Sequence, residues 1–155
     1  MKKTIFSMLF VITVQLAFSQ NFNQLADYEF QTEASYKTEE HNVLMCANYL
    51  FNNPADQEEV NRLKSIQYIL KWMTGTPDYT FELGQNSTEL TKGKDELLGM
   101  YMAAMSKVVI ENTGTPLTND DIYNRSEALL VEYCSNPDNN MKPSKKIKKI
   151  IKSRA

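Results

Sequence analysis

The chain has 155 residues, with 19 acidic and 17 basic side chains and only two cysteines. This length fits one domain, and no segment after residue 19 approaches the roughly 20 apolar residues of a membrane span. Residues 27–138 hold every acid and carry a net charge of −11, whereas the last 14 residues carry +7. An acidic body repels phosphates, which disfavours nucleic-acid binding by the protein as a whole.

The first 19 residues have the pattern of a secretory signal peptide. Lys2 and Lys3 give a positive start, residues 5–16 form a mostly apolar core, and residues 17–19 (Ala-Phe-Ser) match the small-residue pattern at a cleavage site. We therefore expect a bacterial protein that is exported to the periplasm or secreted, with a mature chain that starts at Gln20.

The rest of the chain predicts an all-α fold. A weakly patterned arm at 20–35, expected to be mobile or loosely docked, precedes a helical domain at 36–138 and a basic tail helix at 139–155. Apolar residues recur at helical spacing, and Pro or Gly marks the helix ends. We expect a compact four-helix domain of two antiparallel helix pairs, plus a short basic C-terminal helix. The expected helices span 38–52, 54–74, 92–112, 118–135 and 143–153.

Three local patterns refine this expectation. The helix at 54–74 carries one apolar stripe that includes Val60 and Leu63, which we expect to face the core. After it, Tyr79 and Phe81 alternate with polar residues, which predicts an extended connector with buried aromatic rings. The polar segment 84–91 is expected to be a surface loop.

Cys46 and Cys134 are far apart in the sequence, and both have apolar flanks. In an exported protein such a pair can oxidise to a disulfide. The alternative is two buried thiols that pack as small apolar side chains. The sequence leaves both interpretations open.

The sequence offers little for catalysis or metal binding. His41 and Glu40 could share a metal, but there is no second histidine and neither cysteine has ligand spacing to it. Met100, Met102 and Met105 present thioethers suited to copper(I), yet they also fit an apolar helix face. We expect no catalytic residue, no metal and no cofactor, which favours a protein that is not an enzyme.

The basic tail is the most unusual surface feature. Its apolar residues are Ile147, Ile150 and Ile151, and lysines surround them. The tail can contact an anionic surface or an acidic partner, or it can fold against the acidic body of its own chain through the isoleucines. The candidate surface-binding residues are Lys145, Lys146, Lys148, Lys149 and Lys152.

Segments 61–63 (NRL), 72–81 (WMTGTPDYTF) and 97–105 (LLGMYMAAM) resemble those of a group of small exported α-helical bacterial proteins with no assigned function. The resemblance covers most of the mature chain and implies an all-helical fold and export. It carries no catalytic or binding residues. We expect a binding or structural protein with an unknown partner and an oligomeric state that the sequence does not define. The alternatives are a carboxylate-based enzyme and a peripheral envelope-surface protein that uses the tail.

Overall fold

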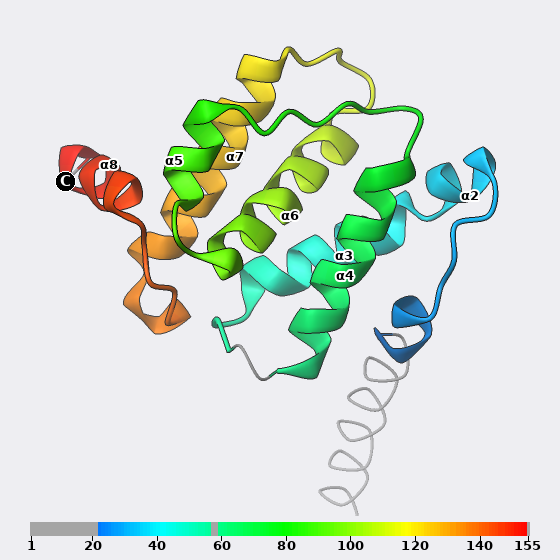
Figure 1. Cartoon of the computed structure of the whole chain (residues 1–155), viewed down its shortest axis with the longest axis horizontal. Coiled ribbons are helices and arrows are strands. Elements are labelled where there is room, and N and C mark those ends of the chain that lie inside the picture. Colours follow the sequence, from blue (N-terminus) through cyan, green and yellow to red (C-terminus); the bar gives the residue numbers. More distant parts are fainter. Residues whose placement is uncertain (1–21, 57–58, 155) are drawn as a thin grey trace, which may run out of the picture.

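The computed structural model describes residues 22–56 and 59–154, and these residues form an all-helical fold without strands. The predicted signal peptide lies outside the described residues. Residues 22–26 are helical, and Figure 1 shows how the later elements are arranged. These elements are α2 (Glu33–Thr38), α3 (Glu40–Asn52), α4 (Val60–Gly75), α5 (Gln85–Thr91), α6 (Asp95–Glu111), α7 (Asn119–Ser135), the 3-10 helix η1 (Pro137–Asn139) and α8 (Lys145–Arg154).

Helix α6 is the central helix, and it contacts α3, α4, α5 and α7 (Figure 1). Its apolar residues occupy nearly every side, as expected for a helix surrounded by others. Gly99 allows α4 to approach closely, because a Cβ atom there would lie only 3.2 Å from Cδ1 of Ile66. Ala103 and Ala104 are also fully buried on α6. Small side chains thus let the neighbouring helices pack around α6.

Helix α7 begins where the sequence predicted. Oγ1 of Thr118 accepts a hydrogen bond from the backbone N of Asp121 at 3.1 Å, and Oδ2 of Asp121 accepts one from the backbone N of Thr118 at 3.0 Å. This reciprocal capping box satisfies two amides that the first turn leaves without helical partners. Hydrogen bonds from the side chain and backbone of Thr118 lower the pKa of Asp121.

Helix α4 begins at Val60, later than the predicted start at residue 54. The carboxylate of Glu59 caps it by accepting from the backbone N atoms of Asn61 at 2.9 Å and Arg62 at 2.7 Å. Further back, the carbonyl oxygen of Pro54 accepts from Nη1 of Arg62 at 3.3 Å. The side chain of Arg62 therefore donates to a carbonyl that a backbone amide would bind in a helix, and residue 54 stays outside α4.

The predicted orientation of the α4 stripe is wrong at its first two positions. Val60 is 54% exposed and Leu63 is 49% exposed. Arg62 is buried instead, because its guanidinium has hydrogen-bond partners in the interior. The buried residues of α4 are Arg62, Ser65, Tyr68, Ile69 and Trp72.

The loop predicted at 84–91 is instead the short helix α5 (Gln85–Thr91). Two of its hydroxyl groups form hydrogen bonds with backbone carbonyls of the same segment. Oγ of Ser87 donates to the carbonyl of Gly84 at 2.8 Å, and Oγ1 of Thr91 donates to the carbonyl of Ser87 at 3.0 Å. Leu90 is fully buried. Local hydroxyl bonds thus allow a polar segment to bury one face.

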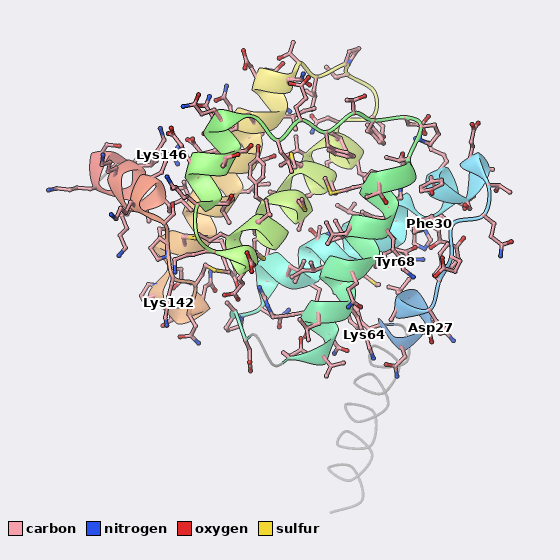
Figure 2. All side chains as sticks on the ribbon, in the orientation of Figure 1. Asp27, Phe30, Lys64, Tyr68, Lys142 and Lys146 are labelled. Carbon is pink, nitrogen blue, oxygen red and sulfur yellow. The ribbon has the colours of Figure 1, made fainter. Side chains whose placement is uncertain are left out.

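The described part of the N-terminal arm is docked on the helical body. Phe22 and Leu25 are buried, and the ring centroid of Phe22 lies 4.7 Å from that of Tyr49 on α3. Further along, the ring of Phe30 stacks on that of Tyr36, with 4.6 Å between the ring centroids. The same ring lies 5.4 Å from that of Tyr68 on α4, and Figure 2 labels Phe30 and Tyr68. Apolar and aromatic burial therefore hold the arm at both ends.

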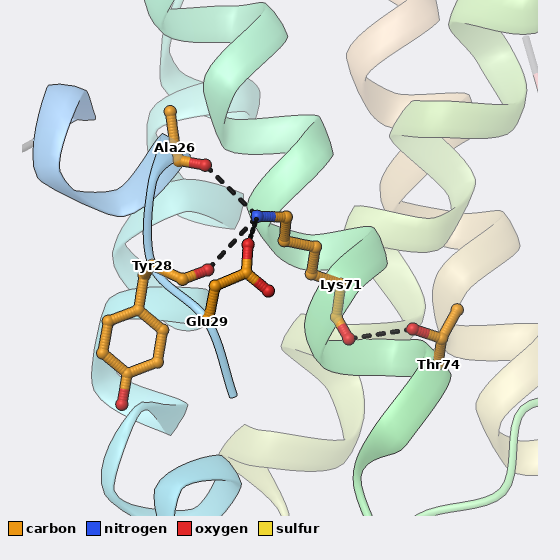
Figure 3. Close-up of polar contacts among 5 residues, drawn as sticks. All are labelled: Ala26, Tyr28, Glu29, Lys71 and Thr74. Carbon is orange, nitrogen blue, oxygen red and sulfur yellow. Dashed lines mark hydrogen bonds and ion pairs between the residues drawn. The ribbon is translucent and has the colours of Figure 1, made fainter. Parts of the chain in front are cut away.

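Lys71 fastens the middle of this arm (Figure 3). Its Nζ donates to the carbonyl oxygens of Ala26 at 3.3 Å and Tyr28 at 3.2 Å, and it lies 2.7 Å from Oε1 of Glu29. Ala26 is the last residue of the first helical segment and Tyr28 lies just after it, so the ammonium group supplies donors to carbonyls beyond which the helix does not continue.

The connector after α4 is extended, and its aromatic residues are half-buried rather than fully buried. The rings of Tyr79 and Phe81 lie 5.6 Å and 5.9 Å from Trp72, measured between centroids. Leu83 remains 49% exposed. Among residues 22–56 and 59–154, no helix has the length and apolar character needed to cross a membrane.

Candidate functional site

Helix α8 docks on the body through its isoleucines, as one of the two interpretations of the tail predicted. Ile147 is fully buried, and Ile150 and Ile151 pack against the core. The helix contacts α5 and α7 (Figure 1). Its start is capped by Ser144, whose Oγ accepts from the backbone N of Ile147 at 3.2 Å. The end is fixed by Arg154, whose Nη2 lies 3.5 Å from Oε1 of Glu127 on α7.

The docked position of α8 leaves its lysines on the surface. Lys146 is half-buried and the other four predicted residues are exposed. Lys142, just before the helix, is exposed too, and Figure 2 shows Lys142 and Lys146 on the same side of the molecule. We call this surface the basic face; it consists of Lys142, Lys145, Lys148, Lys149 and Lys152.

A groove lies between α5 and the beginning of α8, with a volume of about 500 Å³. The basic face supplies Lys145 and Lys148 to it, and Lys92 and Lys94 line it from the turn after α5. Glu89 is the acidic residue in its lining. No pattern in the sequence pointed to Lys92 and Lys94, because they lie some fifty residues before the tail and only the contact between α5 and α8 brings them there.

A larger cleft, of about 540 Å³, lies beside the beginnings of α4 and α6. Its lining balances three acids with three basic residues, so it has no net charge. Arg62 lies at this cleft, but its guanidinium serves the fold: Nη1 donates to the carbonyl of Leu50 at 3.2 Å and Nη2 to Sδ of Met100 at 3.3 Å. The lining residues include Asp56, Arg62, Lys94, Asp95, Glu96 and Lys142.

The cysteines are both buried and both free thiols in the structure. Burial raises the pKa of Cys46 and of Cys134 to about 12, with the charge of Glu96 adding to the effect at Cys134. A thiol with such a pKa is protonated at neutral pH and is a poor nucleophile. The burial of the two free cysteines therefore agrees with the interpretation that they are thiols that pack as small apolar side chains.

The other candidates for chemistry lie apart from the basic face. His41 is exposed, and its Nδ1 lies 3.0 Å from the carbonyl oxygen of Thr38. Met100 and Met105 are buried and Met102 is half-buried, so these methionines fill the core. Within the described residues, no group of three or more histidine, cysteine or acidic side chains is placed to hold a metal.

Comparisons with family models, with curated proteins and with solved structures found no match. The interpretation of the basic face therefore depends on its own geometry. The face combines exposed lysines, a groove lined by further lysines and a buried apolar side, which is an arrangement suited to electrostatic contact with an anionic partner.

Proposed function

We propose that the protein is an exported binding protein that contacts an anionic envelope partner through the basic face. The observation that carries this proposal is the orientation of α8: Ile147 is buried and Lys145, Lys148, Lys149 and Lys152 are exposed. A helix that served only to cover the core would need no such row of like charges. Their mutual repulsion is relieved when an anionic partner binds.

We also propose that α3, α4, α6 and α7 form the body that carries this face, as two antiparallel pairs of α3 with α4 and α6 with α7. These two pairs make the most extensive helix contacts in the described residues. The body is acidic and the face is basic, so the partner is expected to meet the molecule at α8. The alternative of a carboxylate-based enzyme has weaker support, because the acids of the larger cleft are balanced by basic neighbours.

The experiment compares two variants with the same change in net charge. Lys149→Gln with Lys152→Gln removes two charges from the basic face, and Lys37→Gln with Lys64→Gln removes two from elsewhere on the surface. Binding is measured to inorganic polyphosphate, to polyglutamate and to vesicles of phosphatidylglycerol with phosphatidylcholine, at low and physiological salt. We expect the wild type to bind at least one of these probes and to bind it less tightly as salt rises.

The α8 variant should bind more weakly by roughly fivefold for each lysine removed, which is the effect of a lysine near an anionic surface. The control variant should bind like the wild type. Failure of the wild type to bind any probe at low salt, or an equal loss in both variants, would contradict the proposal.

A further inference from the structure

We propose that the groove between α5 and α8 binds the phosphate groups of an anionic polymer. This inference depends on the proposed function, since it names the chemistry of the partner that the basic face would hold. It adds Lys92 and Lys94, which belong to a different part of the chain, to the binding residues.

The charge of the groove is strongly one-sided. Lys92, Lys94, Lys145 and Lys148 line it together with the single acid Glu89. The carboxylate of Glu89 already accepts a hydrogen bond from Nε2 of Gln85 at 3.2 Å. The lining therefore carries a net charge of +3, and a hollow lined by one sign of charge concentrates its field on whatever enters.

The groove lysines have no acidic partner in the part of the chain that the structure describes. The ion pairs found there involve Lys37, Lys71, Lys107 and Arg154. Lys107, for example, lies 2.5 Å from Oε1 of Glu111. Unlike these four residues, the groove lysines therefore have no such ion pair to break before a ligand binds.

The side-chain type favours phosphate over carboxylate. A lysine ammonium acts as a compact point charge with three rotatable donors and binds phosphate in that way. A carboxylate has two oxygens in one plane, whereas a phosphate presents its oxygens in a tetrahedral arrangement that several ammonium groups can approach from different sides. No arginine is among the lining residues of the groove. Several ammonium groups around one hollow suit a tetrahedral group whose charge is spread over several oxygens.

The position of α8 favours a polymer over a bilayer. Ile147 is fully buried, and Ile150 and Ile151 also face the body, so α8 has no apolar side to insert among lipid chains. Beyond the groove, the row of lysines continues to Lys152. The helical rise places Lys145 and Lys152 about 10 Å apart along the axis of α8. Successive phosphate groups of a polymer chain can therefore contact successive lysines of this row.

The test uses inorganic polyphosphate and polyglutamate chains of matched total charge. The groove variant is Lys92→Gln with Lys94→Gln, and its matched control is Lys37→Gln with Lys64→Gln. Circular dichroism confirms that both are folded, and Lys145→Gln with Lys148→Gln provides a second groove variant from the other side. We expect the wild type to bind polyphosphate at least tenfold more tightly than polyglutamate.

Each groove variant should lose roughly fivefold in polyphosphate affinity for each lysine. The slope of log affinity against log salt should become shallower by about 0.7 for each phosphate that the variant no longer neutralises. The control should change neither quantity.

Other outcomes overturn the inference in distinguishable ways. If Lys149→Gln with Lys152→Gln weakens binding but Lys92→Gln with Lys94→Gln does not, the groove is not the site and the proposed function stands. Equal affinity for both polymers would exclude the phosphate preference, and binding to vesicles alone would replace the polymer with a membrane. Binding to no probe would contradict both proposals.

Discussion

Arg62 on α4 and Tyr133 on α7 donate to the same acceptor, the backbone carbonyl of Asn53. Nη1 of Arg62 lies 3.4 Å from that oxygen, and Oη of Tyr133 lies 2.5 Å from it. Nη1 of Arg62 also reaches the carbonyl of Leu50 at 3.2 Å. Two helices thus secure the end of α3, where the last carbonyls of a helix lack partners within the helix itself.

Substituting Arg62→Met should lower the free energy of unfolding by about 2–3 kcal/mol, because the buried carbonyl of Leu50 and the partly buried carbonyl of Asn53 lose a charged donor. Urea denaturation followed by the fluorescence of Trp72 measures the change. The control is Arg125→Met at an exposed site, where Nη1 donates to Oδ1 of Asn112 at 2.7 Å. The control should stay within about 0.5 kcal/mol of the wild type. Equal losses in the two variants would show that Arg62 has no special role.

The docking of the N-terminal arm gives a second prediction. Lys71→Met should speed hydrogen exchange in residues 22–30, because the carbonyls of Ala26 and Tyr28 lose their shared donor. Glu29→Gln removes only the ion pair with Lys71, and the side chain of Glu29 is 71% exposed. It should therefore change exchange little. Exchange that is the same in Lys71→Met and the wild type would mean that apolar burial alone holds the arm.

The docking of α8 predicts that the tail contributes to stability. Ile147→Ala should cost about 2–5 kcal/mol, as expected for a fully buried isoleucine. Ile150→Ala, at a half-buried position on the same helix, should cost less. Urea midpoints of the two variants give the comparison. A loss below about 0.5 kcal/mol for Ile147→Ala would indicate that α8 leaves the body in solution.

The buried thiols predict a loss of stability at alkaline pH. Cys46 and Cys134 have pKa values raised from 9.0 to about 12 in the folded protein. Between these values the unfolded chain has released protons that the folded chain retains, so the free energy of unfolding falls as pH rises. Below about pH 9 the two thiols make no difference to the pH dependence.

Urea midpoints at about pH 8 and about pH 11 test this prediction. The variant Cys46→Ala with Cys134→Ala should lose less stability over that interval than the wild type. Part of the loss should persist, because burial also raises the pKa of Tyr68. A pH dependence that is unchanged in the variant would contradict the assignment. Thiol titration of the unfolded wild type under non-reducing conditions should find both groups free.

The sequence predicted best what depends on neighbouring residues. The start of α7 follows from a capping box between Thr118 and Asp121, three positions apart, and the inward side of α8 follows from the spacing of its isoleucines. Prediction from the sequence was wrong where polar residues are buried. Hydrophobic periodicity assigns Arg62 to the surface, yet its guanidinium is buried and donates to the buried carbonyl of Leu50 and to the partly buried carbonyls of Asn53 and Pro54.

The same limit applies to α5 and to the groove. Ser87 and Thr91 satisfy their hydroxyls on carbonyls one turn back, so a segment that looks like a loop covers the core with Leu90. The lysine run of the tail is visible in the sequence. The contribution of Lys92 and Lys94 is not, because it arises from the tertiary contact between α5 and α8.

The separation of charge between the body and the tail also constrains how copies of the protein could cover a surface. A molecule held by the lysines of α8 presents its body, with a net charge of −11 over residues 27–138, to the medium and to its neighbours. Neighbouring bodies repel each other over distances comparable to the Debye length, about 8 Å at physiological ionic strength. Bound molecules would therefore share one orientation and keep apart, and their density on the surface would rise with salt until screening weakened their own attachment.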